Sequence, residues 1–168
     1  VPPAQRIPQV IVGSAKQTLQ WNAAHADAWA TYYRPFEEQK GRFGLWRQAV
    51  EQRGQGNDPA LIQSMSLDLL EHPDAPAQEI SLGLRTGSKA LVETLHRYRE
   101  IGLEHCLFAK ASDDRPTVEV IEQLGRTLTM SAGARSGLGA ATAKMLVEQG
   151  GEVVLADINA EAGAAKAA

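Results

Sequence analysis

The sequence predicts an α/β fold with parallel strands, and three observations support this prediction. Short apolar runs at residues 10–12 and 106–108 have the length and composition of buried strands. Segments whose apolar residues recur at helical spacing lie between such runs, and this alternation of strand and helix is typical of parallel sheets. Nearer the C-terminus, the glycine-rich residues 132–139 precede a helical stretch and a third apolar run at residues 153–156. We therefore expect helices to connect neighbouring strands along the chain.

Composition and charge narrow the classes of function. At 168 residues the chain fits one ordinary domain or two small ones, and 43% hydrophobic with 22% charged residues indicates a globular protein rather than a disordered one. The net charge of −3 gives no reason to expect a nucleic acid or an anionic membrane as partner, so we expect a small-molecule substrate. No apolar run approaches the ~20 residues of a membrane span. Cys106 is the single cysteine, as expected in a reducing, cytoplasmic environment, and Val1 in place of methionine indicates a natural start further upstream.

The first strand and helix contain the first candidate binding residues. Residues 10–12 form a short strand, which we expect to be buried and to end at Gly13. Ser14, with Gln17 three residues later, has the pattern of a capping box and predicts a helix to about Ala26. Backbone N–H groups at Gly13 and Ser14 are suited to receive a phosphate at the end of the strand. An ordinary turn with a serine cap explains the same residues equally well.

Further strands and helices follow in the same order. A second strand is expected at about residues 28–31, and the next helix begins at Pro35 and ends at Gly54. Residues 63–69 alternate between apolar and polar side chains, which predicts a half-exposed strand. The later elements are a helix from Ser88 to Gly102, a strand at residues 106–108 and a helix that ends near Leu124.

Three segments of this part, residues 8–14, 23–29 and 80–87, resemble the C-terminal third of luciferase-like flavin-dependent monooxygenases. The resemblance covers about residues 7–124. It implies a partial (β/α)8 TIM-barrel segment that consists of the last three strand–helix units of the barrel.

This resemblance also implies strand positions and a cofactor. The strands at Val10, Trp29 and Leu107 would be the sixth, seventh and eighth of the barrel, with the first five absent. Members of the family hold reduced FMN or a deazaflavin at the C-terminal ends of their strands. Gly13 and Ser14 are the cofactor-binding residues that the resemblance implies.

A few other polar residues are weaker candidates. Thr31 and Tyr32 follow the second strand and could line the same mouth of the sheet, although Tyr32 equally fits a packing residue at the rim. Arg85 could pair with a phosphate, but a surface arginine is the commoner case. The four histidines lie on different elements and do not have the spacing of a metal site.

The glycine-rich residues 132–139 form the most specific motif in the sequence. A phosphate bound at a helix N-terminus needs free backbone N–H groups, and glycines let it approach them closely. Asp157 follows Gly139 at close to the ~20 residues expected between such a loop and the carboxylate that binds a ribose. The alternative is a tightly packed glycine-rich connection that binds nothing.

This motif resembles the Thr-Gly-x-x-x-Gly-x-Gly start of short-chain dehydrogenases/reductases, over about residues 126–168. The resemblance implies a partial Rossmann-like βαβ unit that binds NAD or NADP. Ala132 stands where the family has threonine, and residues 126–130, where its first strand would lie, contain few β-branched apolar residues. NAD is favoured, because Asp157 can accept a hydrogen bond from a ribose hydroxyl and would repel a 2′-phosphate. The implied nucleotide-binding residues are Gly133, Ser136, Gly137, Leu138, Gly139 and Asp157.

The two resemblances meet near Gly125, which divides the chain into residues 1–124 and 125–168. We expect two separate α/β pieces, with few contacts across residues 124–130, as in a fusion of two incomplete oxidoreductases. Such pieces have unpaired strand edges, and a second copy of the chain could pair with these edges to form a homo-oligomer.

Neither piece contains a complete catalytic set. In the dehydrogenase family a Tyr-x-x-x-Lys pair transfers the proton, but no lysine lies four residues after Tyr32, Tyr33 or Tyr98. We therefore expect an oxidoreductase-derived chain that does not turn over substrate by itself. The alternative is a non-catalytic nucleotide-binding or inert α/β module.

Overall fold

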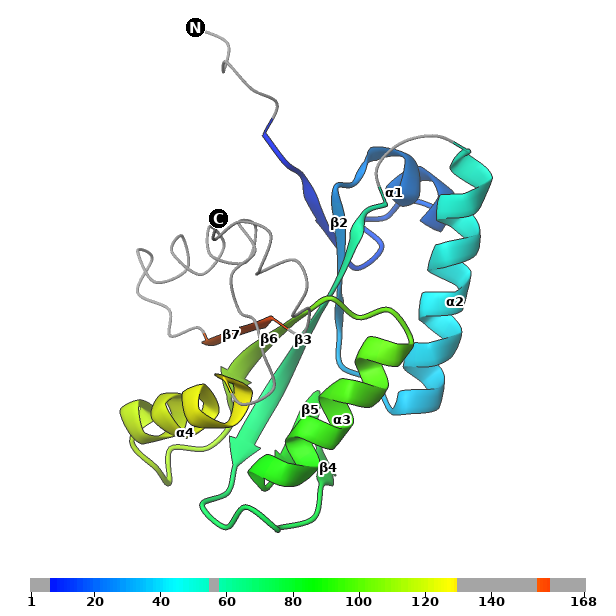
Figure 1. Cartoon of the computed structure of the whole chain (residues 1–168). Helices are drawn as coiled ribbons and strands as arrows, with labels where there is room; N and C mark the ends of the chain where they lie inside the picture. The colour runs from blue at the N-terminus through cyan, green and yellow to red at the C-terminus, as the bar shows by residue number, and fades with distance from the viewer. Residues whose placement is uncertain (1–6, 55–57, 130–153, 158–168) are drawn as a thin grey trace, which may run out of the picture.

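The computed structural model describes residues 7–54, 58–129 and 154–157, with side chains for residues 7–54 and 58–127. In these residues the chain forms an α/β structure with a curled half-barrel sheet of mainly parallel strands (Figure 1). The strands are β1 (Val10–Val12), β2 (Ala28–Tyr32), β3 (Ala60–Leu69), β4 (Gln78–Ile80), β5 (Gly83–Thr86), β6 (His105–Lys110) and β7 (Val154–Asp157). The helices are α1 (Leu19–His25), α2 (Phe36–Arg53), α3 (Ser88–Glu100) and α4 (Thr117–Thr129).

Strand β3 is the centre of the sheet. Its first half pairs in parallel with β2 and its second half with β5, while β6 pairs with it in parallel along residues 62–67. The amide of Tyr33 donates to Ser64 O at 2.8 Å, and the amide of Ser66 donates to Leu82 O at 2.8 Å. Alternate residues of a parallel strand bond to opposite edges, so β2 and β5 follow one another along one edge of β3 and β6 occupies the other.

The position of β3 changes the expected strand order. It lies between the strands that contain Trp29 and Leu107, so these two strands are not neighbours as the seventh and eighth strands of a barrel would be. The short strand β4 pairs with β5 in antiparallel register and was not expected from the sequence. The α/β class with parallel strands is confirmed, and the sheet is mixed rather than purely parallel.

The alternation of residues 63–69 is confirmed, and it builds the core. Met65, Leu67 and Leu69 are 1–2% exposed and belong to the apolar cluster between the sheet and the helices. Trp29 and Trp46 stack in this cluster with their ring centroids 4.7 Å apart. Burying a leucine or methionine side chain contributes about 1.5–3 kcal/mol. The apolar cluster between the sheet and the helices is therefore the main source of stability. Helices α2 and α3 cover this side of the sheet (Figure 1).

The expected start of the first helix is wrong. The cap of α1 is Thr18, whose Oγ1 accepts the Trp21 amide at 3.1 Å, and the helix starts at Leu19. Ser14 belongs to a turn instead, in which its carbonyl accepts the amide of Gln17 at 2.8 Å. Strand β1 lies at the edge of the described sheet, and Val10 and Val12 are exposed rather than buried as expected.

The boundaries of α2 and α3 agree closely with the sequence. Helix α2 follows Pro35 and ends at Gly54, which has φ +80°. Helix α3 begins at Ser88, capped by Gly87, and is followed by Gly102 with φ +97°. Glycine is favoured at both C-terminal positions because side chains rarely adopt positive φ.

Helix α4 continues to Thr129, so residues 126–129 are helical where the dehydrogenase resemblance placed a first strand. The reason is local, because Leu128 follows Leu124 at helical spacing and neither glycine nor proline occurs between Gly125 and Gly133. Strand β7 pairs with β6 in antiparallel register, with Asp157 opposite His105. The described strand of residues 125–168 therefore belongs to the same sheet as the first part, and its pairing differs from the parallel pairing of a βαβ unit.

Within the ranges described, no helix combines the length and the apolar character that crossing a membrane requires.

Candidate functional site

The turn that follows β1 brings the first candidate residues to the C-terminal end of that strand. Gly13 has φ +62°, and Ala15 and Lys16 also have positive φ, at 45° and 58°. Two buried donors hold the turn: Trp29 Nε1 donates to Gly13 O at 2.7 Å, and Asn22 Nδ2 donates to Ser14 O at 3.2 Å. Such positive-φ residues cost energy unless surrounding contacts fix them, and they cluster at functional sites.

A pocket of about 220 Å³ lies against this turn. It is smaller than the ~300–1,000 Å³ of sites that enclose drug-sized ligands, so it fits a small molecule or one end of a larger one. Its lining combines apolar and polar side chains from the turn, α1, β2 and α2: Gly13, Ser14, Gln17, Leu19, Asn22, Trp29, Arg42 and Leu45.

Arg42 is the charged residue of this pocket. Its guanidinium lies 5.6 Å from the centre of the Trp29 ring, and its buried Nε has no hydrogen-bond partner. Burial lowers the pKa of Arg42, and the nearby charge of Arg34 lowers it further. Among the side chains described, no carboxylate forms an ion pair with Arg42, whereas Arg34 lies 3.6 Å from Glu38. The pocket therefore has an uncompensated positive charge.

Asn22 is the second unusual group. Its side chain is 1% exposed, and its amide nitrogen bonds to the turn, but its Oδ1 has no partner. A buried acceptor without a hydrogen bond costs roughly 1–3 kcal/mol. Asn22 and Arg42 therefore both bring unused hydrogen-bonding capacity to one pocket.

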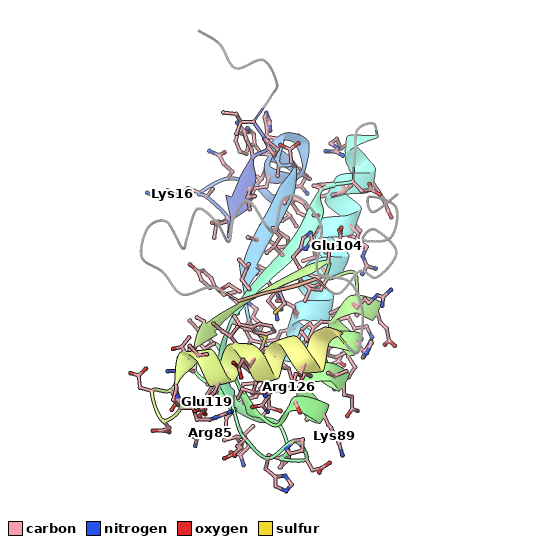
Figure 2. The ribbon with its side chains drawn as sticks, turned by 60° about the vertical axis from the view of Figure 1, so that its left-hand side comes forward. Lys16, Arg85, Lys89, Glu104, Glu119 and Arg126 are labelled. Atoms are coloured by element: carbon pink, nitrogen blue, oxygen red, sulfur yellow. The ribbon has the colours of Figure 1, made fainter. Side chains whose placement is uncertain are left out.

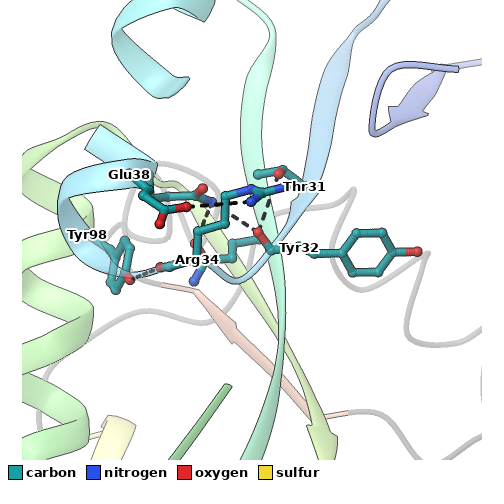
Figure 3. A network of polar contacts seen from close by, with 7 residues as sticks. Thr31, Tyr32, Arg34, Glu38 and Tyr98 are labelled. Carbon is teal, nitrogen blue, oxygen red and sulfur yellow. Dashed lines mark hydrogen bonds and ion pairs between the residues drawn. The ribbon is translucent and has the colours of Figure 1, made fainter. Parts of the chain in front are cut away.

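The residues expected beside the second strand are not part of this pocket. Figure 3 shows Tyr32 with its ring directed away from the contacts among Arg34, Glu38 and Tyr98. The Tyr32 side chain is 55% exposed, while Thr31 is buried. Tyr98 donates its hydroxyl to Arg34 O at 2.7 Å, and burial raises the pKa of Tyr98. This end of β2 is therefore held by structural contacts.

Arg85 does not join the site either. Its Nε donates to Asp68 Oδ2 at 2.6 Å across the paired strands β3 and β5, which compensates its charge. Figure 2 shows Arg85 and Lys89 at the far end of the molecule from Lys16, which lies in the turn after β1. Arg85 thus acts as a strand-pairing residue in this structure.

The nucleotide-binding residues expected near the C-terminus lie mostly outside the described residues. This applies to Gly133, Ser136, Gly137, Leu138 and Gly139. Asp157 is described as the last residue of β7, and its backbone pairs with His105.

The described residues contain neither a cluster of metal-binding side chains nor a reactive thiol. No group of three His, Cys, Asp or Glu side chains there could hold a metal ion. Cys106 is buried, and this burial raises the pKa of its thiol, which makes it unreactive. His25 stacks on Trp21 at 4.1 Å and bonds to Trp21 O at 2.8 Å, so it is a residue of the helix end.

Searches for similar proteins gave no match, either among protein-family models or among curated proteins. Asn22 and Arg42 were not predicted as site residues. Each is one polar residue within a helix, and no local pattern reveals that two helices place them at the same pocket.

Proposed function

We propose that this chain is derived from oxidoreductases, with a luciferase-like flavin-dependent monooxygenase part joined to an NAD-binding start of the short-chain dehydrogenase type. The turn at Gly13 and Ser14 would receive the phosphate of FMN or of a deazaflavin. When bound, the flavin would supply electron transfer and oxygen activation, and the chain would hold and orient it.

One observation supports the phosphate assignment most directly. Within the described part of the chain, the amides of Ser14 and Ala15 make no hydrogen bond, although the neighbouring carbonyls are held by Trp29 and Asn22. Free backbone N–H groups in a turn with positive φ are suited to bind anionic oxygens. The uncompensated Arg42 nearby adds positive potential. The pocket is too small for a whole flavin, and the proposal places the phosphate on the turn amides of Ser14 and Ala15 rather than in the pocket.

The expected dinucleotide is NAD, on the resemblance of residues 126–168 alone. No pair of the type Tyr-x-x-x-Lys exists in the sequence, so binding without turnover is the expected behaviour. The competing function is a non-catalytic nucleotide-binding or inert α/β module.

The test compares two ligands that differ by one phosphate. Purified full-length chain is titrated with FMN and with riboflavin, and flavin fluorescence is followed. We expect FMN to bind and riboflavin to bind at least tenfold more weakly, because the turn contacts the phosphate. Equal affinity, or no binding of FMN or a deazaflavin, would overturn the flavin assignment.

A second measurement addresses the dinucleotide and catalysis. NAD and NADP are titrated by calorimetry, and NADH consumption is followed with FMN present. We expect NAD to bind more tightly than NADP and NADH to persist. Tighter NADP binding contradicts the Asp157 argument, and sustained NADH loss that Gly139→Val abolishes contradicts the expected inactivity.

A further inference from the structure

The pocket beside the β1–α1 turn has a composition that a flavin phosphate does not explain. Arg42 forms no hydrogen bond with any residue that the structure describes, and its buried Nε is unpartnered. Asn22 lines the same pocket with an unpartnered Oδ1 in a side chain that is 1% exposed. One group offers donors and a positive charge, and the other offers an acceptor.

The charge favours a monoanion. Arg42 is the one cationic residue in the lining, and no acidic residue is part of it. Lys16 lies in the adjacent turn but does not line the pocket, and its side chain extends away from the ribbon (Figure 2). A phosphomonoester has about −1.5 to −2 charges near neutral pH, more than one guanidinium balances. A carboxylate has a single charge and matches the planar guanidinium with two hydrogen bonds.

The buried acceptor adds a second requirement. An anion alone would leave Asn22 Oδ1 unpaired, because oxygen atoms of a carboxylate are acceptors only. A hydroxyl or ammonium group on the carbon beside the carboxylate would donate to it. The volume of about 220 Å³ and the apolar walls formed by Leu19, Trp29 and Leu45 suit a small organic acid with a short side chain.

We propose that this pocket binds a small α-hydroxy or α-amino carboxylate, with Arg42 binding the carboxylate and Asn22 Oδ1 accepting from the neighbouring hydroxyl or ammonium group. This inference goes beyond the proposed function and does not depend on flavin binding.

The first test uses a ligand series on the unaltered full-length chain. Lactate, alanine, propionate and inorganic phosphate are titrated by calorimetry. Lactate and propionate differ by the hydroxyl alone, and we expect propionate to bind at least fivefold more weakly. Lactate and alanine together identify which donor the pocket prefers. Equal binding of lactate and propionate, phosphate that displaces the bound acid and binds more tightly than it does, or no binding of lactate and alanine overturns the proposal.

The second test uses two variants, each of which removes one positive charge. Arg42→Gln should weaken lactate binding at least tenfold, whereas Arg34→Gln, on a neighbouring guanidinium that pairs with Glu38, should change it less than twofold. Equal losses in both variants would show a general electrostatic effect and overturn the assignment. Circular dichroism of both variants verifies that they fold.

The same samples distinguish this inference from the flavin proposal. FMN binding without binding of lactate or alanine would overturn the inference and leave the flavin assignment standing. Binding of lactate or alanine without FMN binding would overturn the flavin assignment and leave the inference standing.

Discussion

The hydrogen bonding of buried polar groups differs between two regions of the molecule. The first region consists of the β1–α1 turn, α1 and α2, and the second extends from β3 to α4. In the first region, Asn22, Gln39 and Arg42 each have a buried atom without a hydrogen-bond partner. Among the described side chains of residues 58–127, no buried polar atom lacks one. Stable cores rarely tolerate unpaired polar atoms, so their concentration in α1 and α2 distinguishes this part of the described chain from residues 58–127.

The second region shows how such groups are satisfied. Arg115 donates to Leu69 O at 2.9 Å and to Gln123 Oε1 at 2.7 Å, and Gln123 Nε2 donates to Leu70 O at 3.1 Å. These bonds tie α4 and the loop before it to the end of β3. This region is therefore a structural support.

An unpaired atom alone does not make a site, as Gln39 shows. Its side chain is fully buried and donates to Gln63 Oε1 at 2.7 Å, and its Oε1 lacks a partner. It does not line the pocket at the turn. Arg42 and Asn22 differ because an open pocket of about 220 Å³ adjoins them.

The largest expected effect on stability comes from the core of the second region, residues 58–127, which we call the supporting region. Leu91 in α3 is fully buried, and Leu91→Ala should lower the free energy of unfolding by about 2–5 kcal/mol. The matched control is Leu45→Ala in α2, because Leu45 is 58% exposed at the pocket and should cost less than about 0.5 kcal/mol. Urea denaturation measures both. Similar losses would contradict the division into a rigid support and an open pocket wall.

Alkaline pH should also destabilise the supporting region. Burial raises the pKa of Cys106 above 9.0 and that of Tyr98 above 10.0, so the folded chain keeps protons that the unfolded chain releases. Stability is therefore full below pH 9 and falls as pH rises, by at most about 1.4 kcal/mol per pH unit for each group. Urea midpoints between pH 8 and pH 11 test this decline.

A conservative variant identifies the source of that decline. Cys106→Ala should reduce the pH dependence between pH 9 and pH 10, because the thiol of the unfolded chain ionises at lower pH than its tyrosines do. An unchanged slope would mean that the Cys106 thiol titrates alike in the folded and unfolded chains.

A smaller change in the free energy of unfolding, this time a gain in stability, is expected in α2. A Cβ at Gly41 meets no atom within 4 Å, so Gly41→Ala should stabilise the helix by about 0.5–1 kcal/mol. Gly102→Ala is the control and should destabilise, because Gly102 has φ +97° and its Cβ would lie 2.9 Å from Arg47. Thermal unfolding compares the two variants. A loss of stability in Gly41→Ala would show that α2 is already strained.

The smallest effect on stability is expected at the pocket itself. Arg42→Gln removes a partly buried charge with no described acidic partner, so the free energy of unfolding should change by less than about 0.5 kcal/mol or rise slightly. Ligand binding should be lost in the same variant. A destabilisation above about 1 kcal/mol would assign Arg42 to the structural support instead.

Much of the secondary structure was determined by the sequence itself, because its signals are local. Helix α2 between Pro35 and Gly54 and the alternating strand around Met65 follow from residues that are neighbours in the chain. The start of α1 was misjudged because Ser14 and Thr18 are both suitable caps, and contacts of the turn with Trp29 and Asn22 decided between them.

What only the tertiary structure decided is the arrangement of these elements. Strand β3 pairs with three other strands, and strand pairing between distant segments is set by packing that no local pattern contains. The same holds for the pocket, which needs a turn, two helices and β2 in contact before Asn22 and Arg42 can line one cavity. The local sequence pattern predicted Gly13 and Ser14 as candidates. The unpartnered Arg42 Nε and Asn22 Oδ1 beside them are features of the tertiary structure alone, because two helices bring them to the same pocket.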